Sequence, residues 1–439
     1  MKRPAPGTPV RPRLGDLARH SPADALCQLG GRPWVVVALA VAFALYFAYH
    51  VTRFRLSGLP LTPTRDAGIV YETVGAILQT GLYPARAQPL HHTPIFPYPP
   101  SALPLFGLLR GGGPTVFMAL WLAAMAAGLA TVARASVAGE ARRLRAAWLL
   151  IAILALPFAD GPISWDLRNL NSNLIYLGLV LAGYAALRRH PLLAGALIGL
   201  SLSLKLYSGL LLPWLLLNGY RRSFVAAVAI TLAAAAWPWP VFGPEGAARL
   251  YRGWLEQLEI IADPNLHALL ADSPTGPPLV TLGRAAAALT GARPDAASTR
   301  TVVGLLSAAW VIMLLWYGWR AWRHLPVTAP SRAALADWTV LLLAPIPLSP
   351  WFEPYHAVAL WPGTILCIAV TLDRDCRSAD RWTAAGGLAG IAASRLVQLP
   401  FDLRGLLMLS AFLSVTAALG LLRPRLRGTP AEPEFRASS

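Results

Sequence analysis

The chain has 439 residues, of which 56% are hydrophobic and 13% charged, and its mean hydropathy is +0.51. An ordinary soluble domain carries about 25% charged residues, so this composition excludes that class of protein. The net charge of +17 does not indicate a nucleic-acid partner, because the basic residues form short clusters between apolar segments, such as Arg142, Arg143 and Arg145 or Arg221 and Arg222. We therefore predict an integral membrane protein that binds no nucleic acid.

The chain begins with an Arg- and Pro-rich leader, residues 1–33, which we expect to be disordered and to precede a retained first helix. A helix that crosses about 30 Å of hydrocarbon needs about 20 apolar residues, and somewhat fewer where it is irregular. The candidate spans in chain order are 34–51, 115–133, 146–160, 172–187, 191–204, 207–219, 223–242, 301–321, 335–350, 355–372, 383–399 and 404–422.

Two segments complicate this layout. The apolar piece 101–109 is too short to cross and ends at Arg110, which is typical of a re-entrant or interfacial helix. The stretch 191–219 is long for one helix, and Lys205 in its middle with the pair Ser208-Gly209 favours two short helices.

The distribution of positive charge gives the orientation. With a cytoplasmic N-terminus, most of the 38 basic residues fall in cytoplasmic segments. We predict an all-α membrane bundle of about twelve helices (range about 10 to 13) over 34–422, with a disordered cytoplasmic tail at 423–439. The outer loops are 52–100 and 243–300, and the second contains an expected amphipathic helix at Tyr251–Ile261.

Polar residues gather at the outer ends of the predicted helices, where each must be compensated and is a candidate for function. Asp66 precedes a helix-like stretch at Ile69–Thr80, and Lys205 stands alone in an apolar hairpin. The remaining polar groups of this face are Tyr98-Pro99-Pro100, Asp160, Trp165, Asp166, Arg168, Asn169, Asn171, Asn173 and the segment from Ser349 to His356. This pattern predicts an active site open to the outer leaflet.

Several of these residues form motifs that follow one another in a set order. The motifs are Asp66 with Tyr71, Gly81-Leu82-Tyr83-Pro84, Tyr98-Pro99-Pro100, Leu170-Asn171-Ser172-Asn173-Leu174, Ala194-Gly195 with Gly199 and Lys205, and Ser349-Pro350 with His356. This order resembles glycosyltransferase family 87, the polyprenol-phosphate-mannose-dependent enzymes of the GT-C superfamily, over residues 60–372. Leu170 and Asn171 replace the family's Gly and Gln, and Tyr355 replaces its first His, differences that concern the sugar and acceptor more than the reaction class.

The resemblance implies a GT-C fold and transfer of a sugar, mannose by family analogy, from a polyprenyl-phosphate donor to an acceptor hydroxyl with inversion. The acceptor would be a glycolipid, a polysaccharide or a protein, and the enzyme would lie in the bacterial cell membrane. Such a displacement needs a general base, a group that binds the leaving phosphate, and a site from which water is excluded. Asp66 is the candidate base; the alternative is a capping residue of the following helix.

Phosphate and sugar contacts follow from the same resemblance. Lys205 and His356 would bind the donor phosphate, with Arg65 and Arg168 as further candidates. The alternatives are a snorkelling lysine, a helix-terminal histidine and surface arginines. The candidates for sugar or acceptor binding are Tyr71, Tyr98, Asn171, Asn173, Trp351, Glu353 and Tyr355. For the amides the alternative is a helix cap, for Glu353 a solvent-exposed acid, and for the aromatic residues an interfacial belt.

No metal or other cofactor is expected. Asp373-Arg374-Asp375 imitates an Asp-x-Asp metal motif but lies in a predicted cytoplasmic loop, as a solvated charge run. His91-His92 has no ligand partner at useful spacing, and Gly111–Gly113 follows no strand. Two other functions stay open: a transporter or flippase of lipid-linked sugars, which the lack of an inverted repeat disfavours, and a non-catalytic protein of envelope polysaccharide assembly.

Overall fold

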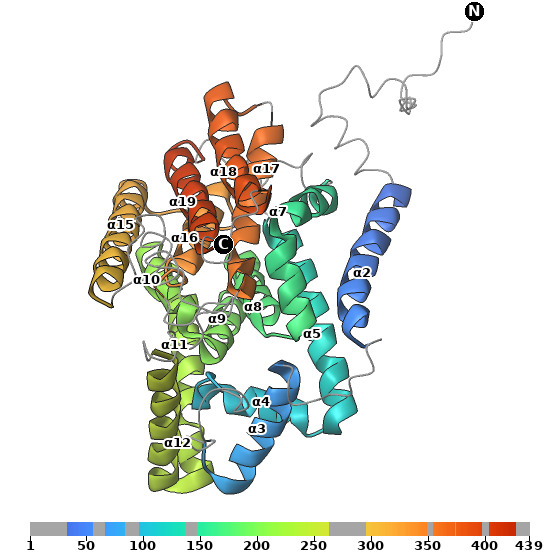
Figure 1. Ribbon diagram of the computed structural model, residues 1–439, viewed down its shortest axis with the longest axis vertical. Helices are drawn as coiled ribbons and strands as arrows, with labels where there is room; N and C mark the ends of the chain where they lie inside the picture. Colours follow the sequence, from blue (N-terminus) through green and yellow to red (C-terminus); the bar gives the residue numbers. More distant parts are fainter. Residues whose placement is uncertain are drawn as a thin grey trace, which may run out of the picture.

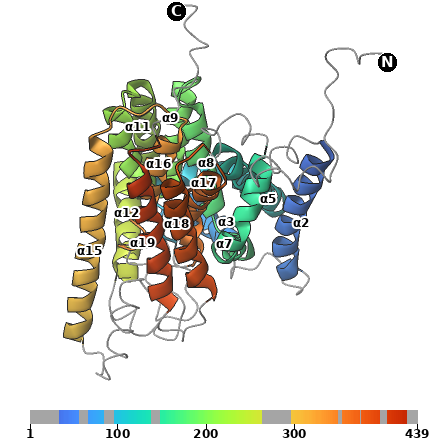
Figure 2. The same ribbon diagram turned by 90° about the horizontal axis from the view of Figure 1, so that it is seen from above.

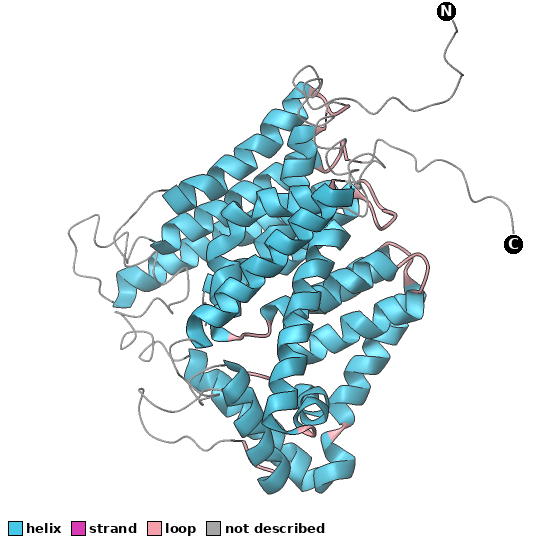
Figure 3. Ribbon diagram, turned by 90° about the vertical axis from the view of Figure 1, so that its right-hand side faces the viewer, coloured by secondary structure: helices cyan, strands magenta, loops and turns pink. Residues whose placement is uncertain are grey.

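In a computed structural model, all regular structure in the described part of the chain is helical (Figure 3). The described residues are 33–55, 66–83, 96–136, 147–262, 296–348, 354–373, 375–396 and 404–426. Within them no strand occurs. The predicted all-α class is therefore confirmed.

The N-terminal half contains the elements that surround the candidate site. They are α2 (Pro33–Arg55), α3 (Asp66–Thr80), η2 (Pro100–Ala102), α4 (Leu103–Arg110), α5 (Gly113–Ser136), α7 (Trp148–Asn169), α8 (Asn173–Ala186), α9 (Pro191–Leu204), η3 (Leu206–Leu210), α10 (Leu211–Leu217), α11 (Arg221–Ala236) and α12 (Pro238–Ala262). The short helix expected at 101–109 is present as η2 and α4. The long apolar stretch at 191–219 is broken at Lys205, whose backbone is extended (φ −144°, ψ 126°).

The C-terminal half completes the bundle. Its elements are α15 (Ala296–Trp322), α16 (Arg332–Leu343), η4 (Pro354–Ala359), α17 (Leu360–Leu372), α18 (Ser378–Leu396) and α19 (Arg404–Leu422). The helices α2 and α15 stand on opposite flanks, while α3, α4 and α12 form one end of the molecule (Figures 1 and 2). In this arrangement α2 packs on α7 and α15 on α19.

The helix α7 differs from the expected span at 146–160. It bends by 89° between Phe158 and Gly161 and then continues as a helix to Asn169. Pro157 and Pro162 lie in this region, and proline removes a helical hydrogen bond and bends a helix without necessarily ending it. The segment expected as an outer turn is therefore a second helical arm. It ends at Leu170, which adopts the left-handed conformation (φ 53°).

Close packing fixes α8 relative to α5. A Cβ atom on Gly178 would lie 2.5 Å from the Cα of Gly128, and one on Gly128 would collide with the carbonyl oxygen of Leu174. Small residues at such crossings let two helix backbones approach closely. The first turn of α8 is thus held directly against α5.

The helix α12 extends the amphipathic helix expected at Tyr251–Ile261 to the whole range from Pro238 to Ala262, with a kink at Gly243 (φ 69°). It covers the loop that leads into η2. The Trp254 indole donates to the carbonyl oxygen of Pro97 at 3.1 Å, and the Tyr83 hydroxyl donates to that of Tyr98 at 2.7 Å. This loop is therefore fixed from two sides.

A buried ion pair joins the residue that follows α19 to α16. Arg423 donates through Nε to Oδ1 of Asp337 at 2.6 Å and through a terminal nitrogen to Oδ2 at 3.0 Å. Tyr317 and Trp214 also donate to this carboxylate, at 2.8 Å and 3.1 Å. The expectation that the chain is disordered after Leu422 is therefore wrong at its start, because Arg423 is fully buried.

Among the described residues, the helix Gly113–Ser136 is long and apolar enough to cross a membrane alone. Two bent pairs can each form one further span: Leu150–Phe158 with Gly161–Asn169, and Arg221–Ala236 with Pro238–Glu259. Shorter apolar helices accompany them, including Asn173–Ala186 and Pro191–Leu204. Membrane character is thus supported, while the total of about twelve crossings stays a prediction.

Candidate active site

Asp66 is the first residue of α3, and its carboxylate meets the turn between α7 and α8. The side-chain amide of Asn171 donates through Nδ2 to Oδ2 of Asp66. The Asp66 side chain is half-buried, whereas Asn171 is only 5% exposed. A carboxylate at a helix N-terminus is also favoured by the helix dipole. The predicted base is therefore oriented by a neighbouring side chain and lies at the edge of the buried region.

Asn173 links this contact to a second acid. Its Nδ2 donates to Oδ1 of Asn171 at 2.8 Å and to Oδ1 of Asp166 at 2.9 Å. Asp166 also accepts from the backbone N–H of Leu174 at 3.0 Å. Helix capping was the alternative role for the two amides, but it is Asp166 that caps this N–H of α8. The amides instead form a continuous polar chain between two carboxylates.

Lys205 completes the network. Its ammonium donates to Oδ1 of Asn173 at 2.6 Å and lies 3.4 Å from Oδ1 of Asn171. The break after α9 places it there, because the extended backbone at Lys205 separates α9 from η3. The two amides of the network therefore hold the Lys205 ammonium in place.

The loop before α4 closes the network from another side. The hydroxyl groups of Tyr98 and Ser172 lie 2.9 Å apart, and Ser101 donates to the carbonyl oxygen of Ser203 at 3.1 Å. Tyr98 is 6% exposed. Tyr98 is thus a buried residue that contacts the turn before α8.

His356 reaches the same region from η4. Its ring is buried and packs edge-on against Tyr207, with 6.1 Å between ring centroids, and Tyr207 packs against Tyr176 at 6.5 Å. Tyr207 lies in η3, which begins directly after Lys205. The structure therefore brings the two predicted phosphate ligands, Lys205 and His356, to one region.

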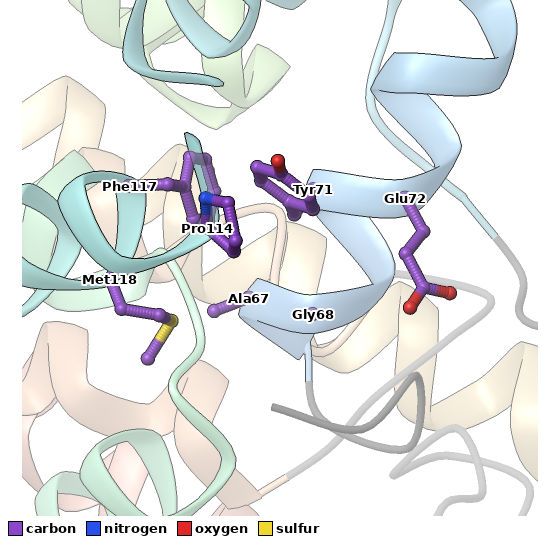
Figure 4. Close-up of a pocket in the computed structure, with 7 residues that line it drawn as sticks. All are labelled: Ala67, Gly68, Tyr71, Glu72, Pro114, Phe117 and Met118. Carbon is purple, nitrogen blue, oxygen red and sulfur yellow. The ribbon is translucent and has the colours of Figure 1, made fainter. Parts of the chain in front are cut away.

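A crevice lies beside Asp66, between α3 and α5. Tyr71 lines it, with its ring edge-on to Phe117 at 5.2 Å and the Arg110 guanidinium 4.9 Å from its centroid. Figure 4 shows the Tyr71 ring beside Phe117, while Glu72 points away from that side chain. The other lining residues are Ala67, Gly68, Pro114 and Met118. The crevice starts at the residue next to Asp66 and is mainly apolar.

The remaining candidates are placed only in part. Arg65, Trp351 and Glu353 lie outside the described residues. Tyr355 is in η4. Arg168 is half-buried in the last turn of α7.

Asp373-Arg374-Asp375 was expected to be a solvated charge run, and for Asp373 this is wrong. Asp373 is 5% exposed and pairs with Arg332 at 2.6 Å. The reason is that the end of α17 packs against the start of α16, which leaves Asp373 and Arg332 to neutralise each other. Within the described residues no group of three His, Cys, Asp or Glu side chains is placed to hold a metal, and His91-His92 lies outside them.

Two residues of the network, Asp166 and Ser172, were given no specific role from the sequence. Asp166 was noted only among the outer polar groups and Ser172 only as part of the motif that contains Asn171 and Asn173. The network joins a carboxylate at its edge, a buried carboxyl group, a lysine and two amides, and a buried histidine lies in the same region. Such a set can accept a proton from a hydroxyl group and bind an anion.

Comparison with known proteins was made at the level of families, single proteins and structures. The model of "Glycosyltransferase family 87" matches residues 96–345, more than half of the chain. No curated protein and no solved structure gave a significant match. The matched range contains Tyr98, Asp166, Asn171, Asn173 and Lys205, while Asp66 precedes it.

Proposed function

The chain belongs to glycosyltransferase family 87 and is a glycosyltransferase. From this premise we propose that it transfers a sugar, namely mannose, from a polyprenyl-phosphate donor to an acceptor hydroxyl. The acceptor is a glycolipid or polysaccharide at the outer face of the membrane. The single observation that carries the proposal is the hydrogen-bonded network that joins Asp66 to Lys205 through Asn171 and Asn173.

Asp66 acts as the general base. It accepts the proton of the acceptor hydroxyl as that oxygen attacks the anomeric carbon of the sugar. A new bond forms between carbon and acceptor oxygen, the bond to the phosphate oxygen breaks, and the configuration at the anomeric carbon inverts. Asn171 supports this role because it fixes one carboxylate oxygen.

Lys205 and His356 bind the phosphate of the donor, which becomes the leaving group. Negative charge grows on the phosphate as the bond to the sugar breaks, and a positioned cation stabilises that charge. The ammonium of Lys205 is positioned by the neutral amide oxygens of Asn171 and Asn173, so it suits this task. Arg65 and Arg168 are further phosphate ligands in the proposal.

Sugar and acceptor groups occupy the region around Tyr98 and the crevice next to Asp66. Tyr71 offers an aromatic surface there, and Asn171 and Asn173 lie within reach of hydroxyl groups. Trp351, Glu353 and Tyr355 belong to the same region in the proposal. The reaction needs no metal or other cofactor in this scheme.

The proposed topology follows the sequence. The transmembrane domain spans 34–422, the leader 1–33 and the tail beyond it lie in the cytoplasm, and the protein resides in the bacterial cell membrane. Reporter fusions at both ends test this: both should report cytoplasmic placement, and a periplasmic end would contradict it.

The donor class is tested with purified protein in nanodiscs and a membrane lipid extract as acceptor. One sample receives radiolabelled polyprenyl-phosphate mannose and a parallel sample receives nucleotide-activated mannose with the same label. We expect a labelled product from the lipid-linked donor only. Transfer from the nucleotide sugar alone, or from neither donor, would overturn the proposal.

A further inference from the structure

Asp166 is a fully buried carboxylate that takes no part in the chemistry described above. It lies in the last turn of α7, and both of its oxygens accept hydrogen bonds: Oδ1 from Asn173 at 2.9 Å and Oδ2 from the N–H of Leu174 at 3.0 Å. The backbone carbonyl of Asp166 also accepts from the N–H of Asn171 at 3.0 Å. One residue thus contacts the whole turn that carries the two amides.

The hydrogen bonds of Asp166 fix which way these amides face. Both of its oxygens accept hydrogen bonds, so the NH₂ group of Asn173 points toward it. The carbonyl oxygen of Asn173 then points toward Lys205, and its second N–H toward Oδ1 of Asn171. With its oxygen occupied, Asn171 presents its own NH₂ group to Asp66.

We propose that Asp166 is a positioning residue, which orients Asn173 and Asn171 and through them both the phosphate-binding lysine and the general base. This inference rests on the proposed function and deepens it. The hydrogen bonds run in one direction from Asp166 through Asn173 and Asn171. One buried carboxyl group thus sets the geometry of Lys205, in the extended segment after α9, and of Asp66, at the start of α3.

A purely structural role, the cap of α8, makes a different prediction. Loss of a cap lowers stability without a specific effect on donor binding. Asp166→Asn separates the two roles because the volume is kept. If the oxygen of the amide introduced at position 166 accepts from the N–H of Leu174, the NH₂ group of that amide faces the NH₂ group of Asn173. The Asn173 side chain must then rotate. After the rotation the NH₂ group of Asn173 faces the Lys205 ammonium, and two donors cannot form a hydrogen bond.

The test measures transfer from polyprenyl-phosphate mannose, and binding of polyprenyl phosphate without sugar, by wild type and D166N. We expect D166N to fold, to lose kcat by about tenfold to a hundredfold, and to need about ten times more donor for half-saturation. The matched control is Asp380→Asn, which alters an acid outside the network that accepts from Arg425 at 2.5 Å. It should leave kcat and KM at the wild-type values.

A second variant tests the order of donors and acceptors along the hydrogen bonds from Asp166 to Asp66. In the double variant D166N/N173D the carboxylate introduced at position 173 can accept from both the amide introduced at position 166 and the ammonium of Lys205, but it cannot donate to Asn171. Because that carboxylate pairs with the Lys205 ammonium and neutralises it, the affinity for polyprenyl phosphate should stay low together with kcat. Wild-type affinity in the double variant would contradict the positioning role of Asp166.

The outcomes separate the two proposals. Wild-type kcat and KM in D166N, or a loss of stability with unchanged kinetics of the folded protein, would overturn the role of Asp166 while the transferase proposal stands. Absence of transfer by wild type would overturn the proposed donor instead, and the binding measurement would still show whether Asp166 controls the affinity for the phosphate.

Discussion

The ammonium of Lys205 lies 2.6 Å from the side-chain oxygen of Asn173, although the two residues are 32 positions apart in the chain. One stands in the extended segment after α9, the other begins α8. The contact exists because α9 ends at Leu204 and the backbone turns toward the α7–α8 junction. The contact thus depends on two helix ends rather than on any single helix.

Replacement of Lys205 by Met removes the ammonium and keeps an unbranched apolar side chain of similar length. We expect the donor KM to rise by about tenfold to a hundredfold, because a hydrogen bond to a charged group contributes about 1.5–3 kcal/mol. Steady-state kinetics with varied polyprenyl-phosphate mannose measures this. Lys205→Arg is the control for charge alone, and full activity in the Met variant would contradict the role of Lys205.

Replacement of Asn171 by Asp places a second carboxylate against Asp66. Two carboxylates that share a site cannot both ionise readily, so the pKa of one of them rises. We expect kcat to fall at neutral pH by at least about tenfold, since the base is then partly protonated. Asn171→Ala, which removes the donor without adding charge, should lower kcat less. Equal kinetics of wild type and both variants would show that Asn171 does not support Asp66.

Gly128→Ala adds a Cβ atom that collides with the carbonyl oxygen of Leu174, in the first turn of α8. We expect a loss of about 1–3 kcal/mol in the free energy of unfolding, which is typical of overpacking. Because Asn173 begins this turn, kcat of the folded protein should fall as well. Thermal unfolding in detergent and kinetics are compared with Gly304→Ala, where an added Cβ meets nothing within 4 Å.

Arg423→Met leaves the buried Asp337 without its ion-pair partner. Loss of one member of a buried pair costs about 3–5 kcal/mol, so the unfolding midpoint should drop clearly. Arg425→Met is the matched control, because Arg425 pairs with Asp380 through a side chain that is 50% exposed and such pairs contribute about 0–1 kcal/mol. Similar midpoints for both variants would refute the structural role of the Arg423–Asp337 pair.

Much of the helix layout could be predicted from apolar length alone. The range 404–422 coincides with α19 and 191–204 with α9, because an apolar run that ends in charged or extended residues also ends the helix. The bend in α7 could not be predicted, since proline either bends or ends a helix and the packing around it decides. The same holds for the full length of α12.

The candidate site was predicted by residue type but not by contact. Asp66, Lys205 and the two amides were recognised as candidates because polar residues gather at the outer ends of the predicted helices and match the motifs of family 87. The structure brings them together. Asp166 was assigned no role, because its importance comes from which donors its two oxygens meet. Asp373 was misjudged for the same reason: its partner Arg332 lies 41 positions away.

The central claim is that Asp66 removes a proton from the acceptor in a sugar transfer. The most direct test compares wild type with Asp66→Asn, purified in nanodiscs, given radiolabelled polyprenyl-phosphate mannose and a membrane lipid extract, with thermal unfolding measured on both. We predict a labelled acceptor with wild type and almost none with the Asn variant, at the same stability. Equal transfer by the two proteins would contradict the claim.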